Sequence, residues 1–367
     1  MKKTIILSGI NLVNGGTFTI MKECLDSISA SSISAQYKVI ALVHKREIFP
    51  QYSNIELIDY PKSKNNYFLR FYYEYYQFKK VSKLYKPYLW LSLHDMSPIV
   101  DADIQAVYMH NPSPFLGRPK SFSFRGLGFS SLYKYIYRIN IHSNKYLIVQ
   151  QNWLRDSFSE MFHFSKDNII VAQPASFTPI KSNNPCLFLK EGEKTFVYAS
   201  YPRGFKNFEI ICEASKILEK KGVKGYRVKL TIDGSENNYA KKLVDTFSSV
   251  RSIEFSGLQP RNKMHDFYSD SDCLIFPSKA ETWGLPISEY KQYNKPMILA
   301  DLPYAHETGA GALKVAFTNP NDAGELAERM SEVIKNDLSH FGIVPIVPLK
   351  APQTKSWDEL FNILLKE

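Results

Sequence analysis

The stretch IFPSKAETWGLPISE, residues 275–289, carries an apolar strand-like run through a polar loop into a predicted helix. Pro286 suits the first helical position, because the N–H that proline lacks would be unpaired there. Gly284 has no Cβ, so a ligand can approach the backbone closely where the helix begins. A buried strand that leads through a short loop into a helix is typical of a parallel α/β sheet.

The same alternation continues on both sides of this stretch. In the second half of the chain, strands are predicted at 195–199, 227–232, 252–255, 273–276, 296–299 and 314–317. Helices are predicted at 205–220, 236–248, 261–269, 286–292 and 322–335. Buried strands that alternate with helices predict a doubly wound parallel sheet.

The first half of the chain shows a similar alternation. Its predicted strands are 3–8, 37–43, 55–58, 89–93, 105–109, 146–149 and 168–172, and its predicted helices are 17–30, 68–85 and 153–162. The polar, proline-containing stretch 173–185 reads as a linker. We therefore predict an α/β protein with two doubly wound, Rossmann-like domains, residues 1–178 and 187–345, that face a central cleft. An amphipathic helix is predicted at 357–365, and we expect residues 356–367 to pack back on the first domain.

Composition excludes several classes of protein. The chain has 367 residues, of which 44% are hydrophobic and 22% are charged, so it is neither disordered nor collagen-like. Four scattered cysteines fit a reducing compartment better than a disulfide framework or a zinc site. No apolar run approaches the roughly 18–20 residues of a membrane helix. The N-terminal MKKTIILSG reads as a buried strand rather than an export signal, so we expect a cytoplasmic protein.

The net charge of +10 is concentrated in the first half of the chain. Up to Cys186 there are 22 Lys and Arg against 12 Asp and Glu, whereas the remainder has 24 of each. The interval between Asp103 and Asp156 contains no acidic residue and has aromatic residues interleaved with cations. The cations are Arg118, Lys120, Arg125, Lys134, Arg138, Lys145 and Arg155. Such a segment could face anionic lipid, nucleic acid or a phosphorylated ligand, or simply be a solvated face of a basic domain.

Two glutamates flank the predicted helix start at 284–286. Glu281 lies in the loop before the helix, and Glu289 is predicted in its first turn. Ionised carboxylates only accept hydrogen bonds, which suits pairs of sugar or ribose hydroxyls. Two glutamates at this spacing also occur by chance, and a glutamate near a helix start often only compensates the helix dipole.

The stretch as a whole resembles the E-x7-E signature of retaining glycosyltransferases of the GT-B fold, family 4. The similarity covers most of the chain and is strongest over residues 195–330. The resemblance implies that Glu281 binds hydroxyls of the donor sugar and that Glu289 binds the nucleotide ribose. It also implies that backbone amides around Trp283, Gly284 and Leu285 hold the sugar and the diphosphate.

Three further segments are similar to sites of this family. In SYPRGFKN, residues 200–207, Arg203 and Lys206 resemble the basic pair that clamps the leaving diphosphate, where fixed cations stabilise the charge that builds up as the glycosidic bond breaks. Gly15 and Gly16 resemble the glycine loop near the donor phosphate. His110 matches the histidine that contacts the donor sugar. By themselves, a Gly-Gly pair reads as a turn, a basic pair as surface charge and a single histidine as structural.

Other features match the family less well. His94 and Asp95 follow a predicted strand and are a second candidate for the cleft. The motif Asp101-Ala102-Asp103 imitates a metal site of the other glycosyltransferase fold, but its surroundings do not, and the GT-B reading needs no metal. Glu289 is followed by Tyr290 and Lys291 where the family usually has small residues, which would reshape the rear wall of the ribose pocket.

The resemblance thus implies a retaining hexosyl transfer without a cofactor. The donor would be a UDP- or GDP-linked sugar, and the acceptor a hydroxyl of a glycan, lipid-linked in O-antigen or capsule synthesis. The basic first domain would contact the anionic inner face of the cell membrane, and no nucleic acid is expected as a partner. Two alternatives remain open: a GT-B nucleotide-sugar epimerase and a non-enzymatic basic binding protein.

Overall fold

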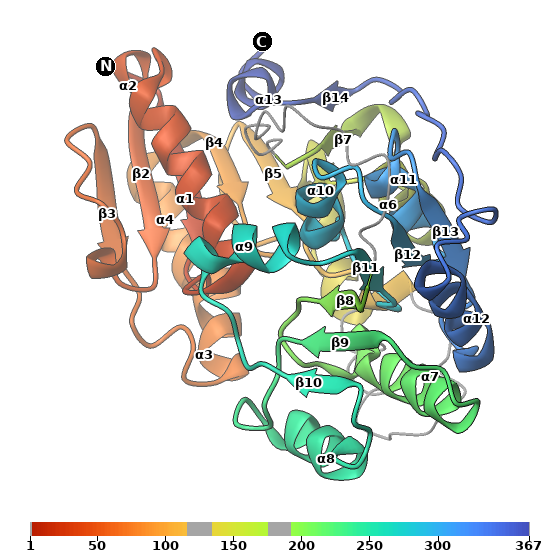
Figure 1. Ribbon diagram of the computed structural model, residues 1–367. Coiled ribbons are helices and arrows are strands. Elements are labelled where there is room, and N and C mark those ends of the chain that lie inside the picture. The colour runs from red at the N-terminus through yellow and green to blue at the C-terminus, as the bar shows by residue number, and fades with distance from the viewer. Residues whose placement is uncertain (1, 116–133, 175–191, 367) are drawn as a thin grey trace. The chain divides into compact units, whose positions relative to one another are not determined.

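The computed structural model describes residues 2–115, 134–174 and 192–366, which divide into two compact units (Figure 1). The first unit contains residues 1–175 together with Leu349–Glu367, and the second contains Ser176–Pro348. The predicted linker at 173–185 spans this boundary and lies mostly outside the described residues.

The first unit is built on a parallel sheet. Its strands are β1 (Thr4–Gly9), β2 (Lys38–Val43), β3 (Ile55–Asp59), β4 (Pro87–Ser92), β5 (Ile104–Tyr108), β6 (Tyr146–Val149), β7 (Ile169–Ala172) and β14 (Gln353–Thr354). Within the described residues their order is β14-β7-β6-β5-β4-β1-β2-β3. The order therefore reverses between β1 and β4, which is the topological switch point where ligands bind in doubly wound sheets.

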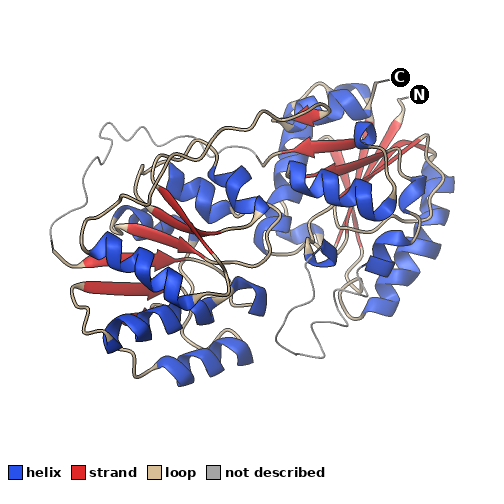
Figure 2. Ribbon diagram, turned by 90° about the vertical axis from the view of Figure 1, so that its right-hand side faces the viewer, coloured by secondary structure: helices blue, strands red, loops and turns tan. Residues whose placement is uncertain are grey.

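Helices cover both faces of this sheet (Figure 2). They are α1 (Gly15–Ala30), α2 (Ile33–Gln36), α3 (Tyr67–Tyr72), α4 (Phe78–Tyr85), α6 (Asn152–Phe162) and α13 (Trp357–Leu364). Alternate residues of β1 face opposite layers, as the period of two along a strand requires. Ile5 and Leu7 pack with Met21 of α1, whereas Ile6 packs with Phe78 of α4.

The predicted helix at 68–85 has an irregularity near its middle. A π-helical turn, Tyr73–Gln77, separates α3 from α4, with no break in the chain of helical residues. Four buried side chains are spaced four residues apart along this segment: Arg70, Glu74, Phe78 and Ser82. This spacing places them on one face of the helix, against the sheet.

The second unit repeats the architecture with six parallel strands in its described part. They are β8 (Lys194–Tyr198), β9 (Tyr226–Leu230), β10 (Ile253–Phe255), β11 (Cys273–Phe276), β12 (Met297–Ala300) and β13 (Val315–Thr318). Their order, β10-β9-β8-β11-β12-β13, reverses between β8 and β11. This is the strand order of a dinucleotide-binding fold. The prediction of two doubly wound α/β units is confirmed.

The helices of the second unit include one that the sequence analysis missed. They are α7 (Phe208–Lys220), α8 (Asn238–Phe247), α9 (Met264–Ser269), α10 (Leu285–Lys291), α11 (Pro303–Gly309) and α12 (Ala323–Ile334). No helix was predicted between residues 292 and 322. Pro303 begins α11 there, as the preference of proline for the first helical turn allows.

The C-terminal segment belongs to the first unit. β14 pairs in parallel with β7, and α13 packs against α1. Leu360, Phe361 and Leu364 of α13 are buried in the same apolar cluster as Met21 of α1. The last helix therefore completes the core that the N-terminal strands begin.

Candidate functional site

Two loops meet at the switch point of the second sheet. One follows β8 and leads to α7, and the other follows β11 and leads to α10. The N–H of Lys279 donates to the carbonyl of Phe205 at 2.7 Å, and the Nδ2 of Asn207 donates to the carbonyl of Pro277 at 3.1 Å. The two loops are thus joined directly across the strand ends.

Lys206 and Glu281 form an ion pair between these loops. The Lys206 Nζ lies 2.5 Å from Glu281 Oε1, and the side chains are 17% and 13% exposed. A short 3-10 turn, Gly204–Lys206, ends at Asn207, whose φ of 59° is in the left-handed region that asparagine tolerates. This turn directs Lys206 toward the β11 loop. The pair joins a fixed cation to a hydrogen-bond acceptor, both still in contact with solvent.

Gly284 shapes the start of α10. Its φ of 85° is strained for any residue with a Cβ, and an added Cβ would lie 3.3 Å from Ile287 Cδ1. The neighbouring Trp283 is fixed at both ends: its Nε1 donates to Ser288 Oγ at 2.8 Å, and its carbonyl accepts from the Thr308 hydroxyl. The backbone of Trp283, Gly284 and Leu285 therefore has one defined conformation before α10.

Glu289 lies one residue further into the helix than predicted. Because α10 begins at Leu285, Pro286 occupies the second helical position and Glu289 falls in the second turn. The Glu289 carboxylate is nearly buried and has two partners. Arg261 Nη1 lies 3.0 Å from Oε1, and the Tyr268 hydroxyl donates to Oε2 at 3.1 Å. Both oxygens are thus held by residues of the segment between β10 and β11.

The large residues after Glu289 have structural roles. Tyr290 is buried, and its hydroxyl lies 2.9 Å from Ser271 Oγ. Lys291 Nζ donates to the carbonyl of Ala310 at 2.9 Å and so ties α10 to the end of α11. Burial lowers the pKa of Lys291. These two side chains thus hold α10 against neighbouring segments of the second unit.

Arg203 is not part of the ion pair. Its guanidinium is exposed and lies 5.9 Å from the centre of the Tyr201 ring. The 3-10 turn points Lys206 toward Glu281 and leaves Arg203 on the surface, because Arg203 precedes the turn in extended conformation. Of the predicted basic pair, the structure brings only Lys206 to the switch point.

In the first unit, His110 follows β5 at the carboxyl edge of the sheet. Its ring stacks on Tyr108 with centroids 4.6 Å apart, and its Nε2 donates to the carbonyl of Leu93 at 3.0 Å. Burial lowers the pKa of His110, so the ring is neutral at pH 7. Asp95 holds the following loop, because its Oδ1 accepts from the N–H of Asn111 at 3.1 Å and from the Tyr137 hydroxyl at 2.8 Å.

His94 lies at the switch point of the first sheet but is fully buried. Its Nε2 is 3.0 Å from Ser8 Oγ and 3.2 Å from Glu74 Oε1, and Arg70 Nη2 donates to its Nδ1 at 3.2 Å. Burial and the Arg70 charge lower the pKa of His94, whereas burial raises the pKa of Glu74 to about 8. A neutral imidazole and a protonated carboxyl therefore form the buried centre of this edge, and His94 cannot touch a ligand directly.

Gly15 and Gly16 stand at the same edge, after β1. Both are exposed, Gly15 has a φ of 70°, and a Cβ placed on Gly15 would meet nothing within 4 Å. The Asp101-Ala102-Asp103 motif lies at the opposite edge, immediately before β5. The motif therefore lies at the amino ends of the strands, away from the edge where ligands of such sheets bind, as expected if it is not a metal site.

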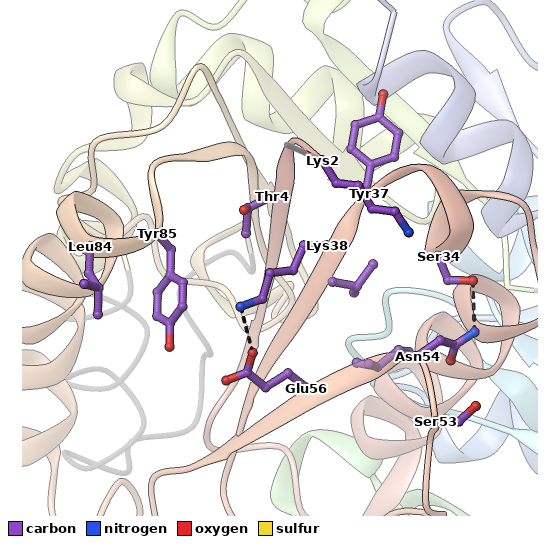
Figure 3. A pocket seen from close by; sticks show the side chains of 12 residues that line it. Lys2, Thr4, Ser34, Tyr37, Lys38, Ser53, Asn54, Glu56, Leu84 and Tyr85 are labelled. Atoms are coloured by element: carbon purple, nitrogen blue, oxygen red, sulfur yellow. Dashed lines mark hydrogen bonds and ion pairs between the residues drawn. The ribbon is translucent and has the colours of Figure 1, made fainter.

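A surface hollow also lies at the amino edge of the first sheet (Figure 3). Lys38 at the start of β2 is paired there with Glu56 of β3 at 3.1 Å, and Leu84 and Tyr85 of α4 line the hollow. Ligands of doubly wound sheets bind at the carboxyl edge. We therefore assign the candidate site to the carboxyl edges and not to this hollow.

The basic segment of the first half is only partly described. Arg118, Lys120 and Arg125 lie outside the described residues. Arg155 is buried and donates to the carbonyl of Lys350 at 2.8 Å, so it ties α6 to the C-terminal segment and offers no charge to a partner. Arg138 is exposed.

Four residues of the second unit were missed as functional candidates: Asn207, Arg261, Tyr268 and Thr308. Asn207 before a helix was the one visible signal, since asparagine favours helix starts. The others contact the site from distant positions, which sequence spacing does not reveal. Among residues 2–115, 134–174 and 192–366, no group of three His, Cys, Asp or Glu side chains could hold a metal ion. None of the helices in these ranges is long and apolar enough to cross a bilayer.

The second unit is similar to a known protein family. Residues 182–341 match the family Glycosyl transferases group 1. Over 228 residues the chain is 22% identical to the O-antigen chain mannosyltransferase RfbU of Salmonella typhimurium. This alignment covers 59% of the chain and 57% of RfbU, so the chain matches little more than half the length of that relative.

Solved structures share the whole fold. WaaG, a glycosyltransferase involved in lipopolysaccharide biosynthesis, superposes with a TM-score of 0.68 at 15% identity, over 90% of each chain. HepE from Anabaena, solved in complex with UDP-glucose, gives a TM-score of 0.55 at 14% identity, again over 90% of each chain. The fold is GT-B, and residues 182–341, somewhat less than half of the chain, match the model of the glycosyl transferases group 1 family.

Proposed function

We propose that this chain, whose second unit is a glycosyl transferases group 1 domain, is a retaining glycosyltransferase. It moves a hexose from a UDP- or GDP-linked donor to a hydroxyl of a glycan. The observation that carries this proposal is the ion pair between Lys206 and Glu281, which bridges the two loops at the switch point of that domain. Ligands of doubly wound sheets bind at this place.

The two members of the pair have complementary tasks. When the glycosidic bond breaks, negative charge builds up on the departing diphosphate, and the Lys206 ammonium stabilises it. The Glu281 carboxylate accepts hydrogen bonds from hydroxyls of the transferred sugar and orients the ring. In the absence of donor each charge is neutralised by the other at 2.5 Å, and donor binding exchanges this contact for contacts with phosphate and sugar.

Glu289 serves the nucleotide. Its carboxylate accepts from a ribose hydroxyl, and the partners Arg261 and Tyr268 hold it in place for this purpose. In the first unit, His110, Gly15 and Gly16 are the residues that the resemblance to the family assigns to donor sugar and phosphate. No metal or other cofactor takes part.

The acceptor in this proposal is a lipid-linked glycan of bacterial surface polysaccharide, O-antigen or capsule. The resemblance to an O-antigen mannosyltransferase and to a lipopolysaccharide glycosyltransferase supports this class. The enzyme then works in the cytoplasm, on the inner face of the cell membrane. Retention follows from attack on the same face of the sugar, with the leaving phosphate taking the proton of the acceptor hydroxyl.

A donor panel tests the proposal. The full chain is incubated with GDP-mannose, UDP-glucose and related nucleotide sugars, and release of nucleoside diphosphate is measured. Lys206→Met and Glu281→Gln should each lower the rate on the order of 10³-fold, the size of loss seen when a transition-state stabiliser is removed. Lys221→Met, which removes an exposed cation at the end of α7, is the matched control and should keep full activity.

Other outcomes would identify a different protein. Full activity of either site variant would reject the assigned site. Recovery of an isomerised nucleotide sugar without acceptor would show an epimerase. Absence of donor binding in calorimetry across the whole panel would leave a non-enzymatic binding protein.

A further inference from the structure

The outer side of the helical segment 67–85 carries an unusual stripe of side chains. Its members are spaced four residues apart and are solvent-exposed; they are Phe68, Tyr72, Tyr76, Lys80 and Leu84. Phe68 is 87% exposed and Leu84 is 75% exposed. We call this set the aromatic–lysine stripe. Soluble surfaces rarely present apolar residues in a continuous row unless the row has a partner.

The fold does not require this stripe. The opposite side of the same segment is buried through Arg70, Glu74, Phe78 and Ser82, which pack toward the sheet. The two sets alternate around one helix, because each has the four-residue spacing of a helix face. The buried face alone therefore packs the helix against the sheet, and the exposed row makes no contribution to this packing.

The charge around the stripe has one sign. Between Asp59 and Asp95 the sequence has a single acidic residue, Glu74, and this residue is fully buried. Over the same interval the exposed cations are Lys62, Lys64, Lys79, Lys80, Lys83 and Lys86. Lys79 and Lys83 flank the stripe directly. Within the segment itself the exposed charge is therefore all positive. At its C-terminal end, Lys83 and Lys86 share a hollow with the exposed Asp101 and Asp103, so the unbalanced positive charge lies toward Lys79 and Lys80.

The side chains of the stripe contact one another and are of the kinds found at the boundary between lipid acyl chains and headgroups. The Tyr72 and Tyr76 rings lie 5.3 Å apart, and the Lys80 ammonium lies 4.5 Å from the centre of the Tyr76 ring. Tyrosine suits the boundary between acyl chains and headgroups, because its ring is apolar and its hydroxyl is polar. Lysine can extend its stem along the same layer while its charge reaches lipid phosphate.

The position of the stripe relative to the sheet fits such a partner. Segment 67–85 follows β3, so its first residues lie toward the carboxyl edge, where Gly15 and His110 also lie. Its last residues reach the amino edge, where Leu84 borders the hollow drawn in Figure 3. A flat partner along the stripe would therefore run past the ligand-binding edge of the first sheet.

We propose that the aromatic–lysine stripe docks the protein on an anionic lipid surface. The apolar rings enter the headgroup layer, and the lysines bind lipid phosphates, as in amphipathic helices that lie in the interface. The inference rests on the proposed function only in that a lipid-linked acceptor gives this contact a purpose. It names residues 68–84 as the contact rather than the predicted basic segment between Asp103 and Asp156.

Vesicle sedimentation with the full chain tests the proposal without donor or acceptor. Vesicles of equal parts phosphatidylcholine and phosphatidylglycerol should bind the protein, and vesicles of phosphatidylcholine alone should bind it much less. Lys79→Gln/Lys80→Gln/Lys83→Gln should weaken binding to anionic vesicles roughly 100-fold, since each lysine near the surface contributes a factor of about five. Phe68→Ser/Tyr72→Ser/Tyr76→Ser should remove the part of the binding that survives high salt.

A matched control removes the same charge elsewhere. Lys220→Gln/Lys221→Gln/Lys224→Gln changes three exposed lysines at the end of α7, in the second unit, and should leave vesicle binding unchanged. Thermal unfolding of the full chain should be equal in all variants, which shows that the first unit is folded, and calorimetric affinity for a nucleoside diphosphate should be equal as well. A donor-binding failure in every variant, the parent included, would count against the proposed function and not against the stripe.

Several results would overturn the inference. One is equal loss of vesicle binding in the stripe and control lysine variants. Another is equal binding to neutral and anionic vesicles. A third is absence of vesicle binding. If the stripe residues then prove necessary for self-association in ultracentrifugation, or for binding of a mixed-sequence RNA, the surface belongs to that other partner.

Discussion

The two sheets have the same kind of switch point, but the ionisable side chains at the two switch points differ in burial. In the second unit, Lys206 and Glu281 meet between β8 and β11 with 17% and 13% of their side chains exposed. In the first unit, Glu74 and His94 meet beside β1 and β4 with side chains fully buried. One pair can exchange partners with a ligand, whereas the other is sealed inside the protein.

This difference in burial decides which ionisable side chains can contact a ligand and which can only support the fold. A buried carboxyl is held neutral because desolvation penalises its charged form, so Glu74 is protonated at neutral pH. The Glu74–His94–Arg70 cluster is thus closed to solvent and can only support the strand ends of the first unit. Similar topology does not imply similar chemistry, because burial decides which charges remain available.

The largest expected effect is a change in how the free energy of unfolding depends on pH when Glu74 is replaced. In the native protein the pKa of Glu74 is about 8, above its value in the unfolded chain. The native state therefore holds a proton that the unfolded state has lost, and stability falls as pH rises from about 4.5 to 8. Glu74→Gln removes this titration and should raise the free energy of unfolding at pH 8 by a few kcal/mol relative to the parent, with little difference near pH 5.

Thermal or urea unfolding from pH 5 to pH 9 measures this effect. Glu56→Gln, a change to an exposed carboxylate in β3, serves as the control and should not alter the pH profile in this window. If the profile of Glu74→Gln runs parallel to that of the parent, Glu74 is ionised in the native state and the contrast between the two switch points disappears.

An intermediate effect concerns the backbone at the accessible switch point. Gly284→Ala forces a Cβ into a left-handed conformation 3.3 Å from Ile287 Cδ1 and should cost about 1–2 kcal/mol of stability. The shifted loop should also weaken nucleoside diphosphate binding. Gly204→Ala is the control, since a Cβ there meets nothing within 4 Å and the residue has no positive φ. Equal stability of the two variants would contradict the tight packing described for α10.

The smallest effect concerns the support of Glu289. Tyr268→Phe deletes the hydroxyl that donates to Glu289 Oε2 and should lower nucleoside diphosphate affinity by about fivefold, or about 1 kcal/mol. The preference for ribose over 2′-deoxyribose nucleotides should fall with it, which loss of packing alone would not produce. Tyr293→Phe makes the same chemical change in a neighbouring ring whose hydroxyl bonds His265 instead. An unchanged ribose preference in Tyr268→Phe would separate Glu289 from ribose binding.

The sequence was informative where the structure depends on local patterns. Apolar runs such as Thr4–Gly9 predict buried parallel strands, because both faces of such a strand are covered. The resemblance in 275–289 and 200–207 identified Glu281 and Lys206, which the structure joins in one ion pair. The boundaries of the domains stay a prediction in detail, since residues 175–191 lie outside the described part.

The sequence was less informative where function depends on contacts across the fold. The partners of Glu289 lie 21 and 28 positions upstream, at Tyr268 and Arg261, on a spacing that no helix or strand period marks. Arg203 is chemically similar to Lys206, and only the intervening 3-10 turn shows that it points elsewhere. The burial of Glu74 could not be predicted, because a single glutamate among tyrosines reads equally well as exposed.

The return of the chain to the first unit has a consequence for how the protein is made. Strand β14 and helix α13 complete the first sheet and its apolar cluster, yet they are translated after all of the second unit. On the ribosome, the second unit can therefore finish folding while the first still exposes the surface that Leu360, Phe361 and Leu364 will cover. The unit whose synthesis starts first is the one that closes last, and residues 1–175 expressed alone should be prone to aggregate.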